Sequence, residues 1–440
     1  MTLVFGTDGV RGDARTLVTP GPVRALAQAA AEVLGTSGFA VGRDPRRSGP
    51  ALADAVHCGV VAAGGMPVNL GVVPTPTVAR WCAEHHVPGA MISASHNPWY
   101  DNGIKFFASG GLKLSDAVQD DISQRFGQLL DVPVEDVVAT VIDEHDAAAI
   151  DHVDAVVASL DGRRLDGLRV VVDAANGAAS IIGPRALAAC GADVIVIHAN
   201  PDGVNINERC GSTHPASLQA AVVEHGADVG VAFDGDADRL LAVDHAGGVI
   251  DGDQIIAVCA LAAQADGRLA GEAVVVTVMT NLGFRRSMAA AGISVVETKV
   301  GDRHVLEALD TRGLSIGGEQ SGHVIFRDRA TTGDGILTAV QLLDVMARRD
   351  RPLAELAAES MTRLPQVLHN VEVSERPDDV ETALAPFVQA SLDRMAGRGR
   401  VLIRPSGTEP LIRVMVEAET DAEAQMEADG LAAAVRSVFV

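Results

Sequence analysis

A chain of 440 residues is too long for one hydrophobic core and predicts three or four domains. Only 3% of the residues are aromatic, so the cores must be built from Ala, Val, Leu and Ile, as in sheets covered by helices. The net charge of −23 argues against a nucleic-acid partner or an anionic membrane surface, and basic residues that bind an anionic ligand must be concentrated in one place.

The cysteines and the first residues favour a cytoplasmic protein. The five cysteines are scattered without a C-x-x-C pair, which indicates a reducing compartment and argues against a disulfide framework or a zinc site. The N-terminal residues lack the charged and apolar regions of a signal peptide, and no uninterrupted apolar stretch is long enough to span a bilayer. We therefore expect a soluble protein that binds neither nucleic acid nor membrane.

A strand–helix–strand pattern occurs three times in chain order. The strands are expected at 39–44, 67–72, 168–173, 193–198, 273–278 and 293–298. A helix is expected between the two strands of each pair: the first at about 49–63, the second ending at residue 190 and the third ending near residue 291. Three βαβ units predict three α/β modules, and one large doubly wound sheet fits the length less well.

Polar and charged breaks divide the chain into four predicted domains. An acidic helix at 143–154 leads into the second module, DGD at 251–253 precedes the third, and LPQ at 364–366 closes it. The last segment predicts a small α+β unit with an antiparallel sheet, from strands at 368–373, 400–404 and 412–418 and helices at 380–396 and 422–435. The domains are expected to span residues 1–150, 151–252, 253–366 and 367–440.

The first motif is SASHNP at 93–98, which follows the apolar run 89–92. The Asn-Pro pair fixes a turn and disfavours a helix at Asn97. A buried strand or turn should therefore deliver a hydroxyl to a rigid loop, with His96 beside it and Lys105 one loop away. This arrangement indicates covalent chemistry at Ser95.

The second motif is FDGDADR at 233–239, at the end of an apolar strand. Asp234, Asp236 and Asp238 can converge on a hard cation through oxygen ligands. An EF-hand is excluded, because its required glycine would fall on Arg239 and its acidic twelfth residue on His245. An acidic solvated turn is the structural alternative; Mg²⁺ completed by a phosphate oxygen is the functional interpretation.

The third motif is GGEQSGH at 317–323. Its glycines bring backbone close to a ligand, while Glu319 and Ser321 can point together at sugar hydroxyls or an amine. Taken alone the motif is a weak signal, and a histidine such as His323 is as often structural as catalytic.

The fourth motif is RPSGTEP at 404–410, with Arg413 after it. Two hydroxyls, a run of backbone N–H groups and two arginines can form a phosphate clamp. The alternative is an ordinary strand-to-helix turn with a capping hydroxyl, and the motif is not a Walker A loop.

Together the four motifs predict phosphoryl transfer, which needs positioning and charge neutralisation more than covalent help. A phosphorylated Ser95 bridged by Mg²⁺ to the three aspartates would meet these demands. Lys105 and His323 are the two candidates for the general base, and Arg11 and Arg239 could hold the transferring group.

The four motifs occur in the order typical of the α-D-phosphohexomutase superfamily, which the chain resembles from FGTDGVRG at 5–12 to the clamp. The segment 92–98, Gln320, Pro405 and Gly407 make it similar to the bacterial branch that acts on glucosamine phosphates. Thr280 and His304 depart from the pattern but lie outside the expected chemistry.

The resemblance implies an α/β protein of three similar α/β domains with mixed sheets plus a smaller C-terminal α+β domain, arranged around a central active-site cleft. It implies interconversion of glucosamine 6-phosphate and glucosamine 1-phosphate for UDP-N-acetylglucosamine and cell-wall synthesis, with one Mg²⁺ and glucosamine 1,6-bisphosphate as intermediate and activator. It also suggests a homodimer, and it places the nucleophile at Ser95 rather than Ser93.

The resemblance assigns site residues by role. The catalytic residues would be Arg11, Ser95, His96, Lys105 and His323. The metal ligands would be Ser95, Asp234, Asp236 and Asp238. Substrate would contact Arg239, Lys299, Gly301, Asp302, Glu319 and Ser321. The distal phosphate would contact Arg404, Ser406, Gly407, Thr408 and Arg413.

Three alternative functions stay open at this point. A phosphomannomutase/phosphoglucomutase would differ only in the substrate's carbon 2. A sugar phosphatase would share the covalent intermediate but has no reason to hold a second phosphate. A non-enzymatic sugar-phosphate sensor would not need the intact nucleophile.

Overall fold

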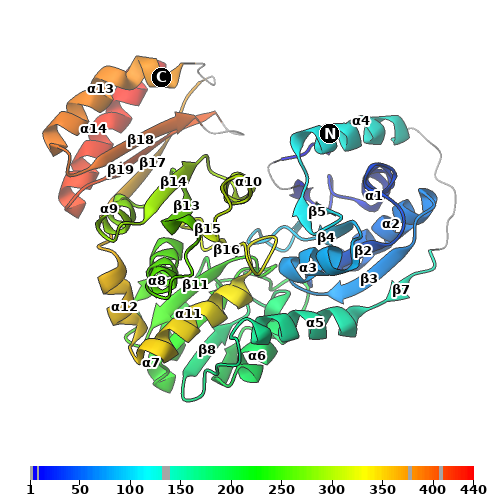
Figure 1. The fold of residues 1–440 in the computed structure, drawn as a ribbon. Coiled ribbons are helices and arrows are strands. Elements are labelled where there is room, and N and C mark those ends of the chain that lie inside the picture. The colour runs from blue at the N-terminus through cyan, green and yellow to red at the C-terminus, as the bar shows by residue number, and fades with distance from the viewer. Residues whose placement is uncertain (1–2, 7–8, 131–138, 375–378, 406–409) are drawn as a thin grey trace. The chain divides into compact units, whose positions relative to one another are not determined.

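The computed structural model describes residues 3–6, 9–130, 139–374, 379–405 and 410–440. The chain divides into two compact units (Figure 1). The larger unit comprises Met1–Met279 and Ile293–Glu359, and the smaller unit comprises Thr280–Gly292 and Ser360–Val440. The four predicted domain boundaries stay predictions.

The first sheet of the larger unit combines parallel and antiparallel strands. Its strands are β1 (Val10–Asp13), β2 (Phe39–Arg43), β3 (Pro67–Val72), β4 (Gly89–Ile92), β5 (Asp101–Ala108), β6 (Leu112–Lys113) and β7 (Ile142–Asp143). They run in the order β1-β5-β4-β2-β3-β7, with β6 on β5. The accompanying helices are α1 (Pro20–Leu34), α2 (Gly49–Ala62), α3 (Thr75–His85) and α4 (Asp116–Leu129). Buried Ala, Val, Leu and Ile side chains from both layers form its core.

The second sheet has three parallel strands at one side and an antiparallel hairpin at the other. Its order is β12 (Val249–Ile250), β11 (Leu240–Asp244), β10 (Val229–Phe233), β8 (Arg169–Asp173), β9 (Asp193–Ile197). The helices of this region are α5 (His145–Ala158), α6 (Ala179–Ala189) and α7 (Ala216–His225). β8 is parallel to both β9 and β10, so the polar loops after these strands meet at one edge.

The third sheet repeats this plan with four strands. Its order is β14 (Ser294–Thr298), β13 (Ala273–Thr277), β15 (Ile316–Gly318), β16 (Val324–Phe326). The helices of this region are α8 (Gly252–Ala265), η1 (Ala270–Glu272), α10 (Asp302–Arg312), α11 (Gly335–Arg349) and α12 (Leu353–Ser360). α11 is buried over most of its length and begins at Asp334, whose side chain accepts the backbone N–H groups of Ile336 and Leu337.

The smaller unit is an antiparallel sheet packed against two long helices. Its sheet has the order β17 (Gln366–Glu372), β19 (Leu411–Glu417), β18 (Arg400–Pro405), and its helices are α13 (Val380–Met395), α14 (Asp421–Phe439) and α9 (Leu282–Ala290). Apolar side chains of β19, α13 and α14 form a core of its own.

The predicted architecture is confirmed: three βαβ units with mixed sheets and a C-terminal α+β region are present. Each of the six predicted βαβ strands occurs with its ends shifted by at most one residue. Two helices differ from expectation. The acidic helix predicted at 143–154 is His145–Ala158, and the last helix runs to Phe439. α9, the helix of the third βαβ unit, groups with the smaller unit.

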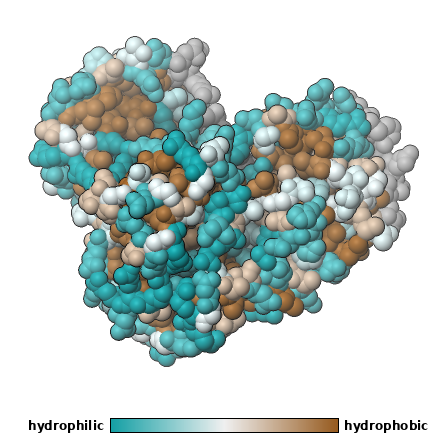
Figure 2. All heavy atoms as spheres, viewed as in Figure 1, coloured by the Kyte–Doolittle hydropathy of each residue, from teal (hydrophilic) through white to brown (hydrophobic). Residues whose placement is uncertain are grey.

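The surface that faces the viewer in Figure 2 is mainly hydrophilic, and its apolar residues lie in separate patches. Within the described ranges, no helix is both long enough and apolar enough to cross a bilayer.

Candidate active site

Ser95 lies on a loop that begins where β4 ends. Because β4 is buried along its whole length, the chain that follows it starts in the interior. Ser95 is 2% exposed and has a φ of +51°, a left-handed conformation that costs a residue other than glycine about 1–3 kcal/mol. Ser93 Oγ accepts the Ser95 backbone N–H at 2.9 Å and donates to Asp44 Oδ2 at 2.6 Å. The Ser93 hydroxyl therefore uses both of these hydrogen bonds to stabilise the loop.

A fully buried arginine, Arg46, holds the Ser95 loop from behind. Its Nε donates to Asp44 Oδ2 at 2.7 Å, and both side chains have 0% exposure. Its terminal nitrogens donate to the carbonyl oxygens of Ser95 (2.8 Å), Asn97 (2.9 Å), Asp101 (3.0 Å) and Pro98. A buried charge is tolerated only when it is paired and hydrogen bonded. The rigid guanidinium thus fixes four carbonyl positions and offsets the strain at Ser95.

The three aspartates follow β10, which ends directly before Asp234. Gly235 allows the two loops to touch, since a Cβ at this position would lie 2.5 Å from the Ser95 carbonyl oxygen. One carboxylate oxygen from each of Asp234, Asp236 and Asp238 lies within 4.8 Å of the other two. Ser95 Oγ donates to Asp234 Oδ2 at 2.5 Å. The fold therefore joins the predicted nucleophile to the predicted metal ligands.

The aspartate group has oxygen atoms to spare for a divalent cation. Asp236 Oδ1 and Asp238 Oδ1 are buried and have no hydrogen-bond partner among the residues that the structure describes. Burial and repulsion from Asp238 and Asp236 raise the pKa of Asp234 to about 8. Lys105 Nζ donates to Asp236 at 2.8 Å and to Asp238 at 3.1 Å. Against the effect of burial, Lys105 and His323 hold the pKa of Asp238 well below its usual range. Rigid, unsatisfied carboxylates are the donor set that Mg²⁺ takes.

Positive and neutral groups surround the Ser95 hydroxyl on its other side. His96 Nδ1 lies 3.3 Å from Ser95 Oγ. Burial and the charges of Arg239 and Arg11 lower the pKa of His96 to about 4, so this imidazole is neutral at physiological pH. Although burial acts in the opposite direction, Asp238 and Asp234 raise the pKa of Arg239. Two guanidiniums beside a buried hydroxyl suit an attached phosphoryl group.

A cavity of about 350 Å³ opens beside Ser95. The predicted site residues that line it are Arg11, Ser95, Lys105, Asp238, Arg239, Gly301, Asp302, Glu319 and His323. The cavity is not lined by His96, Asp234 or Asp236, nor by Lys299 and Ser321, which are exposed. The volume falls in the range of small-molecule sites and accommodates a phosphorylated hexose.

Loops of the third sheet close the far side of the cavity. Glu319 Oε1 accepts the Gly301 backbone N–H at 3.1 Å. This bond joins the GGEQSGH segment at 317–323 to the start of α10. His323 Nε2 accepts the Gly333 backbone N–H at 3.2 Å, and a Cβ at residue 333 would lie 2.4 Å from that nitrogen. Although burial lowers it, the neighbouring Asp238 and then Asp302 raise the pKa of His323 above its ordinary value.

Sequence reasoning did not single out the residues that support these loops. Thr75, at the start of α3, donates its hydroxyl to Asp236 Oδ2 at 2.7 Å. Asn207 Nδ2 donates to the Ser95 carbonyl oxygen at 2.9 Å, and Lys113 forms an ion pair with Asp302. No local pattern marks these residues, and the same is true of Arg46, because their partners lie 49 to 189 residues away.

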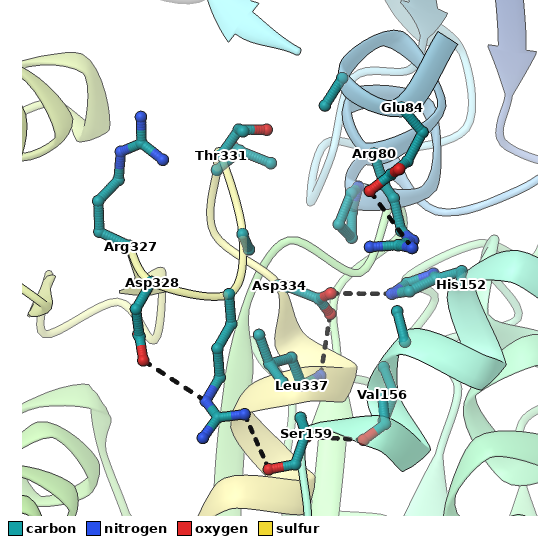
Figure 3. A pocket seen from close by; sticks show the side chains of 16 residues that line it. Arg80, Glu84, His152, Val156, Ser159, Arg327, Asp328, Thr331, Asp334 and Leu337 are labelled. Atoms are coloured by element: carbon teal, nitrogen blue, oxygen red, sulfur yellow. Dashed lines mark hydrogen bonds and ion pairs between the residues drawn. The ribbon is translucent and has the colours of Figure 1, made fainter. Parts of the chain in front are cut away.

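A second pocket, of about 240 Å³, lies between α3, α5 and the segment 327–337 (Figure 3). Asp334 and His152, which both line this pocket, point toward one another, with His152 Nε2 2.8 Å from Asp334 Oδ2 (Figure 3). Thr77 Oγ1 lies 2.7 Å from the other ring nitrogen. The Gly335 N–H donates to the Ala237 carbonyl oxygen at 3.0 Å. This network therefore holds in place the segment 233–239, which carries the three aspartates and is called the metal loop below.

The predicted phosphate clamp belongs to the smaller unit. Arg404 on β18 lies directly opposite Arg413 on β19, so both guanidiniums emerge on one face of the sheet. Burial and the nearby charge of Arg413 lower the pKa of Arg404. Ser406, Gly407 and Thr408 lie outside the described residues. Two arginine side chains on one face of a sheet are able to bind an anion.

Family models cover almost the whole chain. They describe phosphoglucomutase/phosphomannomutase alpha/beta/alpha domain I (residues 2–131), domain II (150–248), domain III (251–364) and the C-terminal domain (368–434). The phosphoglucosamine mutase of Frankia alni is 53% identical over 100% of this chain and 99% of its own length. The phosphoglucosamine mutase of Thermobifida fusca is 52% identical over 99% and 98%.

Solved structures share the fold at lower identity. A putative phosphomannomutase from Thermus thermophilus matches with a TM-score of 0.81 at 24% identity over 99% of both chains. The Aspergillus fumigatus N-acetylphosphoglucosamine mutase in complex with GlcNAc-6P and magnesium matches with a TM-score of 0.73 at 20% identity, over 100% of this chain and 96% of that one. The chain therefore belongs to the phosphoglucomutase/phosphomannomutase family and, by its full-length identity to them, to the phosphoglucosamine mutases.

Proposed function

We propose that this enzyme interconverts glucosamine 6-phosphate and glucosamine 1-phosphate through a phosphoserine at Ser95. The observation that carries the proposal is the 2.5 Å contact between Ser95 Oγ and Asp234, beside a cavity that also presents Arg11, Lys105 and His323. A buried hydroxyl held in a left-handed backbone, against unsatisfied carboxylates, is arranged for group transfer rather than for packing.

Asp234, Asp236 and Asp238, together with an oxygen of the Ser95 phosphate, would hold one Mg²⁺. When bound, this cation would neutralise charge on the phosphoryl oxygens. The fungal relative's complex with magnesium and the unsatisfied oxygens of this loop support the assignment.

In the transfer step a sugar hydroxyl oxygen attacks the phosphorus, and the bond between phosphorus and the Ser95 oxygen breaks. The hydroxyl proton passes to a base in the cavity, and a proton is returned to the departing oxygen. Lys105 and His323 are the candidates for this exchange. Lys105 is held between two carboxylates, whereas Asp238 makes His323 a stronger base than an ordinary histidine. Arg11 and Arg239 would bind the transferring group, and Glu319 would bind the sugar.

One nucleophile must serve two oxygens at opposite ends of the sugar. The first transfer therefore yields a sugar 1,6-bisphosphate, which must turn over before the second transfer. Arg404 and Arg413 would bind whichever phosphate is not reacting, together with Ser406, Gly407 and Thr408. Lys299, Gly301, Asp302 and Ser321 are further proposed substrate contacts, and a homodimer stays a prediction.

The test combines a mass measurement with a product assay. Protein treated with glucosamine 1,6-bisphosphate should gain one phosphate, and Ser95→Ala should gain none and lose isomerisation. Ser93→Ala is the matched control, which should still accept phosphate although its loop is weakened. Release of free phosphate without isomerised sugar would overturn the proposal in favour of a phosphatase. Faster turnover of glucose or mannose 1-phosphate than of glucosamine 1-phosphate would favour a phosphomannomutase/phosphoglucomutase.

A further inference from the structure

Three metal-ligating side chains of different kinds meet at the edge of the second sheet, outside the residues that line the catalytic cavity. Asp173 ends β8, His198 follows β9, and Cys210 lies in the loop before α7. One ligand atom from each lies within 4.8 Å of the other two. β8 and β9 are parallel with Asp173 opposite Ile197, so the side chains after both strands reach the same edge.

The imidazole of His198 is the least satisfied member of the group. Its Nδ1 is buried and lies 3.1 Å from Asp173 Oδ2, yet it has no hydrogen-bond partner within the described part of the chain. His198 also has a φ of +48°, in the left-handed region that few residues other than glycine adopt. The imidazole nitrogen, the carboxylate and the thiol thus lie together with bonding capacity left for a metal ion.

The other two ligands are fixed in place by the backbone. Asp173 Oδ1 accepts the Ala175 N–H at 2.9 Å, and Asp173 Oδ2 accepts the Gly211 N–H at 2.9 Å. The Gly211 contact ties the loop of Cys210 to the carboxylate. Asp173 and Cys210 have 0% exposure, whereas 31% of the His198 side chain is exposed, so water reaches the group from one side.

We propose that Asp173, His198 and Cys210 form a zinc site with water as the fourth ligand. A thiolate and an imidazole select zinc over Mg²⁺, which prefers oxygen ligands throughout. Ligand atoms around tetrahedral zinc lie about 3.3–3.8 Å apart, so the distances within the group need to shorten by about 1.5 Å at most. Binding replaces the thiol proton of Cys210, which passes to solvent, with a bond from the sulfur to zinc.

The site would act on the loops around Ser95 through the segment that carries Cys210. Asn207, three residues earlier, donates to the Ser95 carbonyl oxygen at 2.9 Å. Ser212 donates its backbone N–H at 2.8 Å to Phe233, the residue before Asp234. Zinc bound to Cys210 would therefore hold the segment 207–212, which contacts both the Ser95 loop and the metal loop. The role of the zinc ion would be to stabilise these two loops.

Cobalt binding gives a direct test, because Co²⁺ replaces Zn²⁺ and reports thiolate ligation by its colour. The metal-free full-length protein is titrated with CoCl₂ in excess MgCl₂, which occupies the aspartate group. We expect one equivalent of Co²⁺ with a sulfur-to-metal charge-transfer band and tetrahedral d–d bands. Cys210→Ser should abolish the charge-transfer band, and His198→Gln should weaken binding at least tenfold.

Cys190→Ser is the matched control, since Cys190 is another buried cysteine of the same domain and should leave the spectrum unchanged. ZnCl₂ should raise the melting temperature of the wild type and of this control but not of His198→Gln. The partly exposed His198 can be replaced without opening the core, so this variant keeps the test valid if Cys210→Ser fails to fold. Absence of the charge-transfer band, or its persistence in either ligand variant, would overturn the proposal. Neither result bears on phosphorylation of Ser95.

Discussion

Two groups of buried carboxylates, one in each unit of the molecule, differ in how fully they are hydrogen bonded. In the larger unit, Asp236 and Asp238 each keep one carboxylate oxygen that accepts no hydrogen bond from a described residue, although Asp238 Oδ1 lies in ion-pair range of Arg239 and His323. In the smaller unit, Glu417 is equally buried, but both of its oxygens are bonded. Arg400 donates to both oxygens at 2.9 Å, and the Leu282 N–H and the Gln366 amide add one bond each.

This difference separates charges that serve ligands from charges that serve the fold. A buried carboxylate with all its lone pairs used contributes to stability and can take no ligand. A buried carboxylate with lone pairs to spare destabilises the free protein and becomes satisfied when a cation or phosphate binds. Unsatisfied hydrogen-bonding capacity, rather than burial or charge alone, is therefore the property that suits the aspartate group to a ligand.

The largest effect is expected from removing one carboxylate of the aspartate group. Asp234→Asn should lower mutase activity by at least about 1,000-fold, because the nucleophile loses its carboxylate partner and the cation a ligand. The same change should leave the melting temperature in EDTA unchanged or higher, since it relieves repulsion from Asp236 and Asp238. Coupled activity assays and thermal melts with and without MgCl₂ measure both quantities.

Asp244→Asn is the control, because this buried carboxylate is satisfied by the N–H groups of Ala246 and Gly248. It should lower stability and leave activity nearly intact. If Asp234→Asn proved as destabilising as Asp244→Asn, the distinction between the two kinds of charge would be wrong.

A satisfied charge in the larger unit provides the next test. Arg46→Met should lower the free energy of unfolding by about 3–5 kcal/mol, since it leaves Asp44 as an uncompensated buried charge and removes the donor to four carbonyl groups. Urea denaturation measures the loss. Arg164→Met, which removes an exposed pair with Asp166, should cost no more than about 0.5 kcal/mol. Equal losses in the two variants would contradict the role given to Arg46.

In the smaller unit, Glu417→Gln should lower the stability of the C-terminal sheet by about 1.5–3 kcal/mol, because charge-assisted bonds to Arg400 are lost while the shape is kept. Hydrogen exchange should rise in β17–β19, with no change around Ser95. The exposed Glu372 at the end of β17 offers a control, and its replacement by Gln should leave exchange unaltered. Faster exchange in the larger unit would show that the two units are not independent in stability.

The smallest effect concerns pH and the second carboxylate of the smaller unit. Hydrogen bonds from Arg394 and from the Ser391 hydroxyl, acting against burial, lower the pKa of Glu427 below its ordinary value of 4.5. Between the lowered pKa and 4.5 the unfolded chain binds more protons than the folded one. The contribution is therefore complete above about pH 4.5 and is lost as the pH falls through the lowered pKa.

Because Arg394 is more than half exposed, this contribution should not exceed about 1 kcal/mol. Urea melts of the wild type and of Glu427→Gln between pH 7 and pH 3 measure it. The two stability curves should converge below the lowered pKa, and curves that stay parallel over this range would refute the assignment.

The sequence alone was enough to locate the six strands of the βαβ units, the three strands of the C-terminal sheet and the loops that carry the four motifs, but not β1, β5, β6, β7, β11, β12, β15 or β16. An apolar run such as 229–232 and the turn residues after it can be recognised in the sequence without knowledge of the rest of the fold. The four motifs were recognisable for the same reason, since each is a short segment at the end of a strand.

The tertiary structure alone decided which of these segments touch and what supports them. Arg46 gave no signal in the sequence, because its role depends on carbonyl groups about fifty residues away. The scattered cysteines argued against zinc, yet Cys210 meets Asp173 and His198 once β8 and β9 become neighbours. Such groupings follow from strand order and register, which are set by packing over the whole unit and leave no mark on any single segment.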